Sequence, residues 1–218
     1  MDVVKPYMYN DSVAGALVFY ATPGTSTANS SYSRSELREQ MEPGNNNVNW
    51  TFAQGGYMKG TLQMGEISKD ASNNYHKTII MQIHGRLSNA QRDAIGAKDN
   101  NGPPVLKIYW EKEKIKVAVK NLKNIHASDE EILKVDAWTD QSKFFNEVVG
   151  FNKFTLEVKV TNNKMTVTLN NKEQFVYDDI HMQKWGVYEN YFKAGNYFQT
   201  RDKDAFARVK YYDLIVQH

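Results

Sequence analysis

The sequence predicts an all-β protein built as a sandwich or barrel, and three observations support this fold class. Several short segments alternate apolar and polar residues, which is the period of a strand with one buried face. Asparagine-rich turns, TNNK at 161–164 and LNNK at 169–172, separate some of these segments. Helical patterns are few; SDEEIL at 128–133, with Ser128 and Glu131 as a capping box, predicts one short helical turn.

Strands are expected where β-branched and aromatic residues recur between polar ones. In chain order they are VAGALVFY (13–20), KTIIMQIHG (77–85), VLKIYWE (105–111), KIKVAVK (114–120), FTLEVKV (154–160) and KMTVTL (164–169). Asparagine adopts the left-handed conformation that tight hairpins need, so the region from 154 to 178 is expected to be an antiparallel meander. Stretches rich in Gly, Pro, Asn and Ser predict surface loops at 21–31, 42–47 and 97–104.

One segment has two interpretations. SYSRSELREQM (31–41) is rich in helix formers and carries a Ser33–Glu36 capping pattern, which favours a helix. Alternation instead favours a strand with Arg34, Glu36 and Arg38 on one face. Local signals leave both interpretations open.

Length and composition bound the class of protein. The chain has 218 residues, and no long linker or low-complexity tract divides it, so residues 1–218 are expected to form one domain. Hydrophobic residues make up 41% and charged residues 24%, which is typical of a globular chain rather than a disordered one. The net charge of +2 gives no global field for nucleic acid or an anionic membrane, so neither is expected as a partner. The absence of cysteine excludes disulfides and thiolate metal sites.

The segment YFKAGNYFQ (191–199) carries an unusual polar face. On a strand, alternate side chains point to opposite faces. One face would then present two phenols, an ammonium group and an amide around a glycine gap, from Tyr191, Lys193, Gly195, Tyr197 and Gln199. The other face is largely apolar.

Three blocks in this order resemble the signature blocks of alginate lyases of polysaccharide lyase family seven. They are RSELRE (34–39), QIH (82–84) and YFKAGNYFQ (191–199), and the resemblance extends through the last strand-like segment, ARVKYYDLIVQH. The resemblance implies a β-jelly roll of two antiparallel sheets, with a concave sheet that forms a cleft for a polyuronate chain. It also implies that RSELR is a strand, which decides between the two interpretations above.

The same resemblance implies an enzyme that cleaves the 1,4-glycosidic bonds of alginate by β-elimination. The family's catalytic set maps onto Arg34, Gln82, His84 and Tyr197. Removal of the C5 proton builds charge beside a carboxylate, so stabilising the enolate is the largest demand on the site. Arg34 and Gln82 can donate to that carboxylate, His84 can donate or act as base, and Tyr197 can protonate the leaving O4.

Further residues of the blocks are expected to bind the substrate, namely Glu36, Arg38, Tyr191, Lys193 and Gln199. Glu36 is expected to hold the two arginines in place. No metal or organic cofactor is expected, because side chains supply the charge neutralisation. The chain is expected to be a monomer. It is also expected to be secreted or periplasmic. Because the first twelve residues lack the apolar core of a signal peptide, the signal peptide is expected to be missing from this sequence.

The mode of cleavage and the substrate preference follow from smaller features. Loops of moderate length suggest an open cleft and endolytic cleavage. Isoleucine in QIH tends to accompany activity on guluronate or mixed blocks in this family, so a preference for guluronate-containing blocks is expected. Ile83 would point away from the sugar, toward the core, and act only by shifting the strand that carries His84.

The remaining histidines and the tryptophans have simpler interpretations. His76, His126, His181 and His218 show no metal-ligand spacing and are expected on the surface or in packing contacts. The four tryptophans, 50, 110, 138 and 185, are expected in the core, with sugar platforms as the alternative.

Two other functions compete with this one. A non-catalytic carbohydrate-binding module could share the architecture, but it needs no base beside an acid. A retaining glycoside hydrolase needs two carboxylates that flank the bond, and no such pair of carboxylates is evident on a predicted inner strand.

Overall fold

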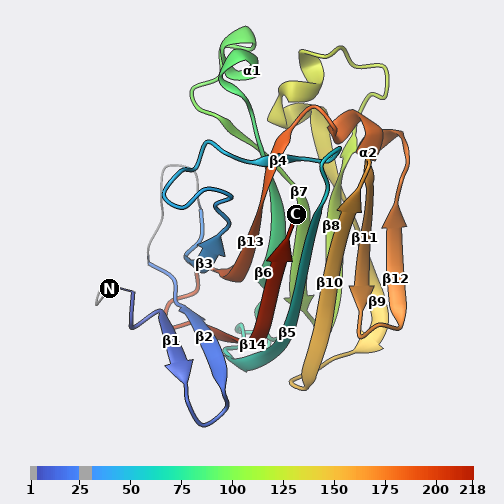
Figure 1. Cartoon of the computed structure of the whole chain (residues 1–218). Helices are drawn as coiled ribbons and strands as arrows, with labels where there is room; N and C mark the ends of the chain where they lie inside the picture. The colour runs from blue at the N-terminus through green and yellow to red at the C-terminus, as the bar shows by residue number, and fades with distance from the viewer. Residues whose placement is uncertain (1–3, 25–30) are drawn as a thin grey trace.

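The computed structural model describes residues 4–24 and 31–218, and it is almost entirely β-structure (Figure 1). A first sheet contains, in spatial order, β1 (Met8–Asp11), β2 (Ala16–Ala21), β14 (Ala207–Gln217), β5 (Gly56–Ile67), β10 (Lys153–Thr161), β11 (Lys164–Leu169) and β12 (Glu173–Tyr177). A second sheet contains β3 (Arg34–Arg38), β13 (Glu189–Phe198), β6 (Thr78–Arg86), β7 (Asn101–Glu111), β8 (Lys114–Leu122) and β9 (Trp138–Val148), and β4 (Trp50–Thr51) pairs with β13.

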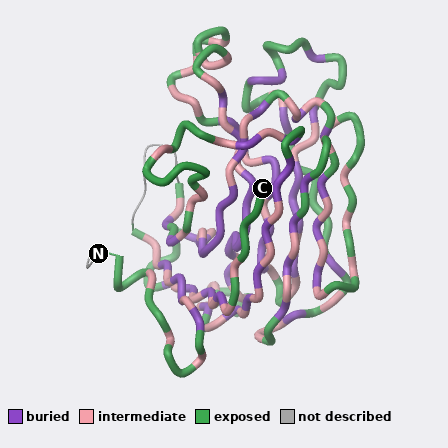
Figure 2. Tube along the Cα trace, viewed as in Figure 1, coloured by how far each residue is buried: buried purple, intermediate pink, exposed green. Residues whose placement is uncertain are grey.

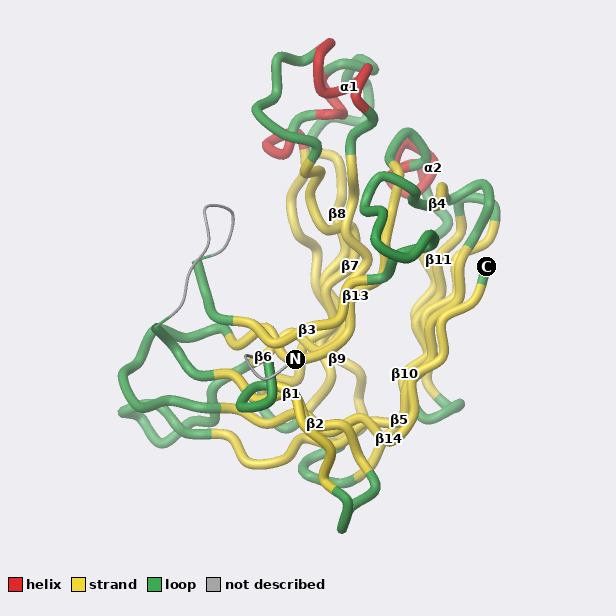
Figure 3. The backbone as a smooth tube through the Cα atoms, turned by 60° about the vertical axis from the view of Figure 1, so that its left-hand side comes forward, coloured by secondary structure: helices red, strands yellow, loops and turns green. Residues whose placement is uncertain are grey.

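The two antiparallel sheets pack face to face, and the chain crosses between them several times, as in a jelly roll (Figure 3). The all-β prediction is therefore confirmed. The helices α1 (Asn89–Ala94) and α2 (Ile180–Trp185) are short and lie at the same end of the sandwich. Within the described residues, no helix combines the length and apolarity needed to cross a membrane.

The core lies between the sheets, and Figure 2 shows buried positions interspersed with less buried ones along the strands. Successive side chains of a strand point to opposite faces, and those on the inner face enter this core. On β6, Met81 and Ile83 are fully buried there. The tryptophans at 50, 110, 138 and 185 are each 3% exposed or less. They are core residues, and the alternative of a sugar platform does not apply to them.

Local turn chemistry was predicted correctly. Asn162, Asn163, Asn170 and Asn171 all have positive φ, between 44° and 64°, in the two hairpin turns of the β10–β12 meander. At 128–133, the Ser128 and Glu131 side chains accept from each other's backbone N–H groups, and a 3₁₀ turn spans Glu131–Leu133.

Other elements differ from the prediction. The predicted loop at 97–104 ends early, because β7 begins at Asn101. Pro104 lies opposite His84 at a shift in register, a place where a strand tolerates proline. Strands β5 and β9 and both α-helices were not predicted. Residues 25–30 of the predicted loop at 21–31 lie outside the described residues.

Glycines explain why β5 was missed. This strand contains Gly56, Gly60 and Gly65, which weaken a strand pattern. At Gly60 an added Cβ would lie 2.8 Å from the Met81 methyl carbon of the facing sheet. The glycine therefore lies where the two sheets pack closely, and it does not form a turn.

Candidate active site

Strand β3 brings three charged side chains to one face of the second sheet. RSELR is a strand, as the resemblance implied, because all five of its residues pair with β13. Arg34 lies opposite Tyr197, and Arg38 lies opposite Lys193. Residues directly opposite each other in an antiparallel pair point to the same face. The polar residues of β3 and β13 therefore share one surface.

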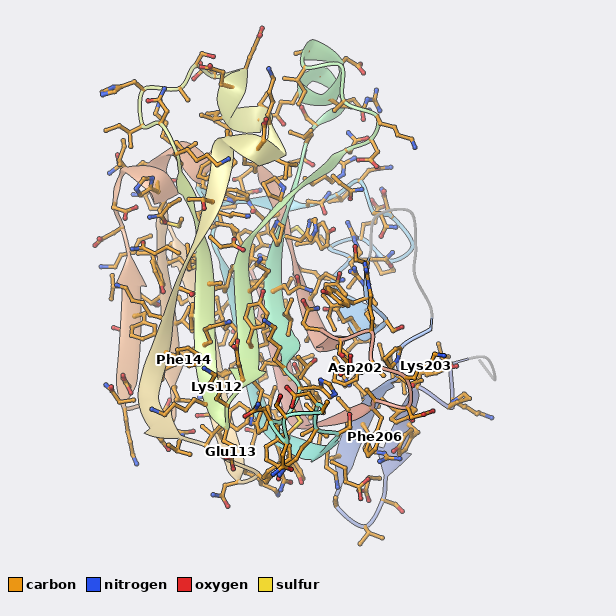
Figure 4. The ribbon with its side chains drawn as sticks, turned by 180° about the vertical axis from the view of Figure 1, so that it is seen from behind. Lys112, Glu113, Phe144, Asp202, Lys203 and Phe206 are labelled. Atoms are coloured by element: carbon orange, nitrogen blue, oxygen red, sulfur yellow. The ribbon has the colours of Figure 1, made fainter. Side chains whose placement is uncertain are left out.

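Strand β6 adds two more groups from the other side of β13. Gln82 lies opposite Lys193, and His84 lies opposite Tyr191. Between them, Ile83 is fully buried in the core, as predicted. Figure 4 views the molecule from behind, with the second sheet nearest the viewer, Phe144 over β9, and the turn at Lys112 and Glu113 at one end of the strands.

Gly195, the glycine gap in the polar face of 191–199, also has a role in how β3 packs. In the structure its φ is +148°, and an added Cβ would lie 2.4 Å from the Ser35 carbonyl oxygen of β3. A register shift between Ala194 and Tyr197 marks a bulge in β13 at this point. The glycine is therefore needed for the close approach of the β3 backbone.

The centre of the polar surface is Glu36, whose side chain is only 2% exposed. One carboxylate oxygen accepts from Gln82 Nε2 at 2.6 Å, and the other accepts from Lys193 Nζ at 2.5 Å. Arg34 Nη1 lies 3.5 Å from the second oxygen. Because all three partners are donors, the buried carboxylate is compensated, and it fixes the orientation of the Gln82 amide.

Arg38 is held in another way than expected. Its guanidinium donates to the Asn46 side chain at 2.6 Å, to the Asn49 side chain at 3.3 Å and to the Glu39 carbonyl at 3.0 Å. The expectation that Glu36 holds both arginines therefore fits Arg34 only. Asn46 and Asn49 belong to a loop whose approach to β3 gives no local signal in the sequence.

His84 is set up as a neutral imidazole. Its Nδ1 lies 2.9 Å from the Gly85 carbonyl, which can only accept, so Nδ1 carries the hydrogen and Nε2 has the lone pair. Burial lowers the pKa of His84 to about 4, and the positive charges of Lys193, Arg34 and Arg38 act in the same direction. A neutral ring with a free lone pair is the form that a general base requires.

Two tyrosine rings lie under the two arginines. The Arg34 guanidinium carbon is 3.9 Å from the ring centre of Tyr197, and that of Arg38 is 3.9 Å from the ring centre of Tyr191. Tyr191 also stacks on His84, with ring centres 5.2 Å apart and an interplanar angle of 17°. Burial raises the pKa of Tyr191, and Arg38 partly offsets this effect.

Gln199 is less closely connected to this group. It follows the end of β13, where its backbone N–H donates to Lys77 O and its amide donates to the Tyr197 carbonyl at 3.0 Å. Three neighbours of the site were not predicted. Lys107 of β7 lies opposite Gln82, and Ile79 packs with Tyr109 against Tyr197. The alternation in VLKIYWE, which puts Lys107 and Tyr109 on one face, was an available signal.

The other histidines have surface or packing roles, as predicted. His76 lies 3.6 Å from Asp202 and edge-on to Phe198, and His181 accepts from the Leu122 N–H. His218 lies 2.5 Å from Glu39, and His126 is exposed. Among the residues that the structure describes, no three or more His, Cys, Asp or Glu side chains gather as a metal site would need.

In this jelly roll, a neutral imidazole, a phenol and several cations lie together on the outer face of one sheet. This combination indicates the class of polysaccharide lyases that act on an acidic chain. The family model described as "Alginate lyase" matches residues 2–218. Alginate lyase A1-II′, a member of polysaccharide lyase family 7, is 30% identical to this chain; the match covers 97% of this chain and 83% of that one, with a TM-score of 0.76. The chain belongs to this family of alginate lyases.

Further solved structures agree with this assignment. A variant of A1-II′ in complex with a substrate (GGMG) is 29% identical, with a TM-score of 0.76 and coverage of 97% of this chain and 81% of that one. The alginate lyase from Klebsiella pneumoniae is 21% identical and shares the fold, with a TM-score of 0.71 and coverage of 97% and 84%. A search of curated proteins finds no match. The protein is thus an alginate lyase, and an enzyme rather than a non-catalytic module.

Proposed function

We propose that this enzyme cleaves the 1,4-glycosidic bonds of alginate by β-elimination, with His84 as base and Tyr197 as acid. The observation that carries the proposal is the His84 ring, whose Nδ1 is committed to the Gly85 carbonyl so that Nε2 is available. His84 lies on the same sheet face as Tyr197. Along β13, its partner Tyr191 is six residues from Tyr197, which is the partner of Arg34.

The step balances without any other group. Nε2 of His84 takes the C5 proton, the electron pair of that C–H bond forms the C4–C5 double bond, and the bond from C4 to O4 breaks. The Tyr197 hydroxyl gives its proton to O4. The products are a new chain end and an unsaturated uronate.

Arg34 and Gln82 are proposed to stabilise the charge that builds on the C5 carboxylate. The Gln82 amide gives one N–H to Glu36, which leaves its second N–H for a ligand. The Arg34 guanidinium has several donors and lies beside Tyr197. Donors fixed before the reaction cost no reorganisation when charge develops. Lys193, Arg38 and Tyr191 are proposed to contact neighbouring parts of the chain.

The preferred substrate is proposed to be guluronate-containing blocks, polyguluronate or mixed. In guluronate the C5 proton and O4 lie on opposite sides, so a separate base and acid are needed, and His84 and Tyr197 can supply them. Crystals of A1-II′ variants hold a substrate (GGMG) and a product (GGG), which supports an oligosaccharide ligand for this family. Ile83 would act on preference through the core, where it is fully buried.

We also propose endolytic cleavage in an open, concave cleft, a monomeric enzyme, and a secreted or periplasmic location. Endolytic cleavage is supported by a site that is built on strands, with loops of moderate length.

The experiment incubates the protein separately with polymannuronate, polyguluronate and mixed alginate, and follows unsaturated ends by ultraviolet absorbance and product sizes by chromatography. Faster formation of unsaturated ends on the guluronate-containing substrates, with early products of many lengths, is expected. A clear preference for polymannuronate would overturn the proposed substrate class, and early products that are only monomers or dimers would overturn the endolytic mode. His84→Asn that retains near-native turnover would remove His84 from the role of base.

A further inference from the structure

Tyr191 contacts the proposed base directly. Its ring stacks on the His84 imidazole with an interplanar angle of 17°, which is close to parallel. The stacking follows from register, because the two residues lie directly opposite each other on β13 and β6. This contact covers a ring face of the residue whose orientation matters most for proton removal.

A cation lies against Tyr191 from the other direction. Arg38 comes from β3, and the spatial order of the strands is β3, β13, β6. The Arg38 guanidinium and the His84 imidazole therefore approach Tyr191 from opposite sides. With the guanidinium carbon 3.9 Å from the ring centre, the three groups form a layered stack of guanidinium, phenol and imidazole.

The outer layer of this stack is anchored. Arg38 donates to the side chains of Asn46 and Asn49. The Asn46 side chain also accepts from Gln40 at 2.8 Å, so the loop is tied to the residues that follow β3. A guanidinium bound at several points has little freedom to move away from the ring.

We propose that Tyr191 is a positioning residue for His84: its ring, held in place by Arg38, fixes the plane of the imidazole and keeps water from that face. This role is separate from a contact with substrate, and it rests on the proposed function in which His84 is the base. A base must be held close to its productive geometry, because small misplacements carry large rate penalties.

Several charged and titratable groups face His84 or lie on the adjoining strands of the same sheet face, and a test of its titration must consider all of them. They are Glu189, Tyr191, Lys193 and Tyr197 on β13, Arg86 on β6, Arg34, Glu36 and Arg38 on β3, and Lys107 and Tyr109 on β7. Three of the cations disfavour the imidazolium form, as does burial. Removing the ring of Tyr191 exposes His84 to water, so its pKa is expected to rise toward the ordinary value.

The test compares Tyr191→Leu, Tyr191→Phe and a matched control. Tyr212→Leu serves as the control, because Tyr212 lies under Lys153 at 3.6 Å on the first sheet and has the same kind of cation contact. Each variant is measured for kcat and KM on alginate. The His84 imidazole is titrated by NMR in the substrate-free protein, with its signal assigned from its absence in His84→Asn.

Tyr191→Leu is expected to lower kcat about tenfold or more, with a smaller change in KM. Its His84 midpoint is expected to rise by about one pH unit. Tyr191→Phe, which keeps the ring, should restore both values, and Tyr212→Leu should change neither. Wild-type kcat and titration in folded Tyr191→Leu would overturn the proposal, as would a loss confined to KM.

A second variant applies if Tyr191→Leu does not fold. Arg38→Lys keeps a positive charge, which lowers the pKa of His84, but removes the planar guanidinium that holds the ring, so a lower kcat is expected. An unchanged kcat would overturn the proposal. Failure of the proposed function would give a different result, because the His84→Asn variant would keep its turnover. The titration of His84 in the Tyr191 variants would still test whether Tyr191 positions the imidazole.

Discussion

Contacts within the protein already fix the positions of side chains in this site. Glu36 binds Gln82, Lys193 and Arg34 at once, so none of these three is a freely moving donor. The buried carboxylate turns a set of long, flexible side chains into a fixed array. An array that is ordered before the ligand arrives loses less conformational entropy on binding.

The first prediction concerns the buried ion pair of Glu36 and Lys193. Lys193 is 9% exposed, so Glu36→Gln would leave a buried ammonium group without its counter-charge. We expect a loss of about 3 kcal/mol in the free energy of unfolding. The double variant Glu36→Gln/Lys193→Met should recover part of that loss. Denaturant unfolding measures both, and equal stability of Glu36→Gln and the wild type would contradict the expectation.

The second prediction concerns Tyr197. Tyr197→Phe keeps the ring that packs on Ile79 and lies under Arg34, and it removes only the hydroxyl. Loss of a positioned acid should lower kcat by at least about 10²-fold, while alginate binding measured by calorimetry stays close to that of the wild type. Near-native turnover would show that another group protonates O4.

At the scale of elements, the bulge in β13 decides how β3 joins the sheet. Gly195 pairs with Glu36, and the backbone of β3 comes so close that no side chain fits there. Asn196, next in sequence, is fully buried and binds the backbone of Phe19 and Ala207 in the first sheet. The bulge therefore ties the polar face to the sheet behind it.

The third prediction tests this glycine. Gly195→Ala should destabilise the fold by at least about 2 kcal/mol and reduce activity, because it combines an unfavourable φ with a backbone clash. Gly96→Ala is the matched control, since Gly96 also has positive φ, +62°, but no atom within 4 Å of an added Cβ. Equal effects of the two substitutions would mean that backbone conformation alone, and not contact with β3, sets the cost.

Sequence patterns predicted the elements that are specified by the chemistry of their own residues. The asparagine turns predicted the β10–β12 meander, and alternation placed Gln82 and His84 on one face. Strand β9 (WTDQSKFFNEV) was missed because it is an edge strand with polar residues on both faces, so its pattern has no period of two. The contact of Asn46 with Arg38 depends on how a loop folds back, which local residues do not encode. The interpretation of RSELR as a strand needed the family resemblance, because local propensity favoured a helix equally.

At the scale of the whole molecule, charge is unevenly distributed. The net charge is only +2, yet Arg34, Arg38 and Lys193 lie on one face of β3 and β13, where Glu36 pairs with Arg34 and Lys193. Attraction for a polyanion must therefore come from this face and not from the molecule as a whole.

The fourth prediction follows from that distribution. Added monovalent salt should raise KM for alginate severalfold between about 50 and 500 mM, because it screens charges at a partly exposed surface. The effect on kcat should be smaller, since the buried contacts of Glu36 are screened less. A KM independent of salt would indicate that hydrogen bonds and packing, and not net charge, dominate binding.

Strand β3 has only five residues, and within the described part of the chain it pairs with β13 alone and forms an edge of its sheet, yet it carries Arg34, Glu36 and Arg38. An edge element of this kind can detach while the rest of the sandwich stays folded. The temperature at which activity is lost is then set by the detachment of this short strand and not by the unfolding of the core. On heating, activity is expected to disappear reversibly before the β-sheet signal in circular dichroism changes, and coincident losses would show that β3 opens only with the whole domain.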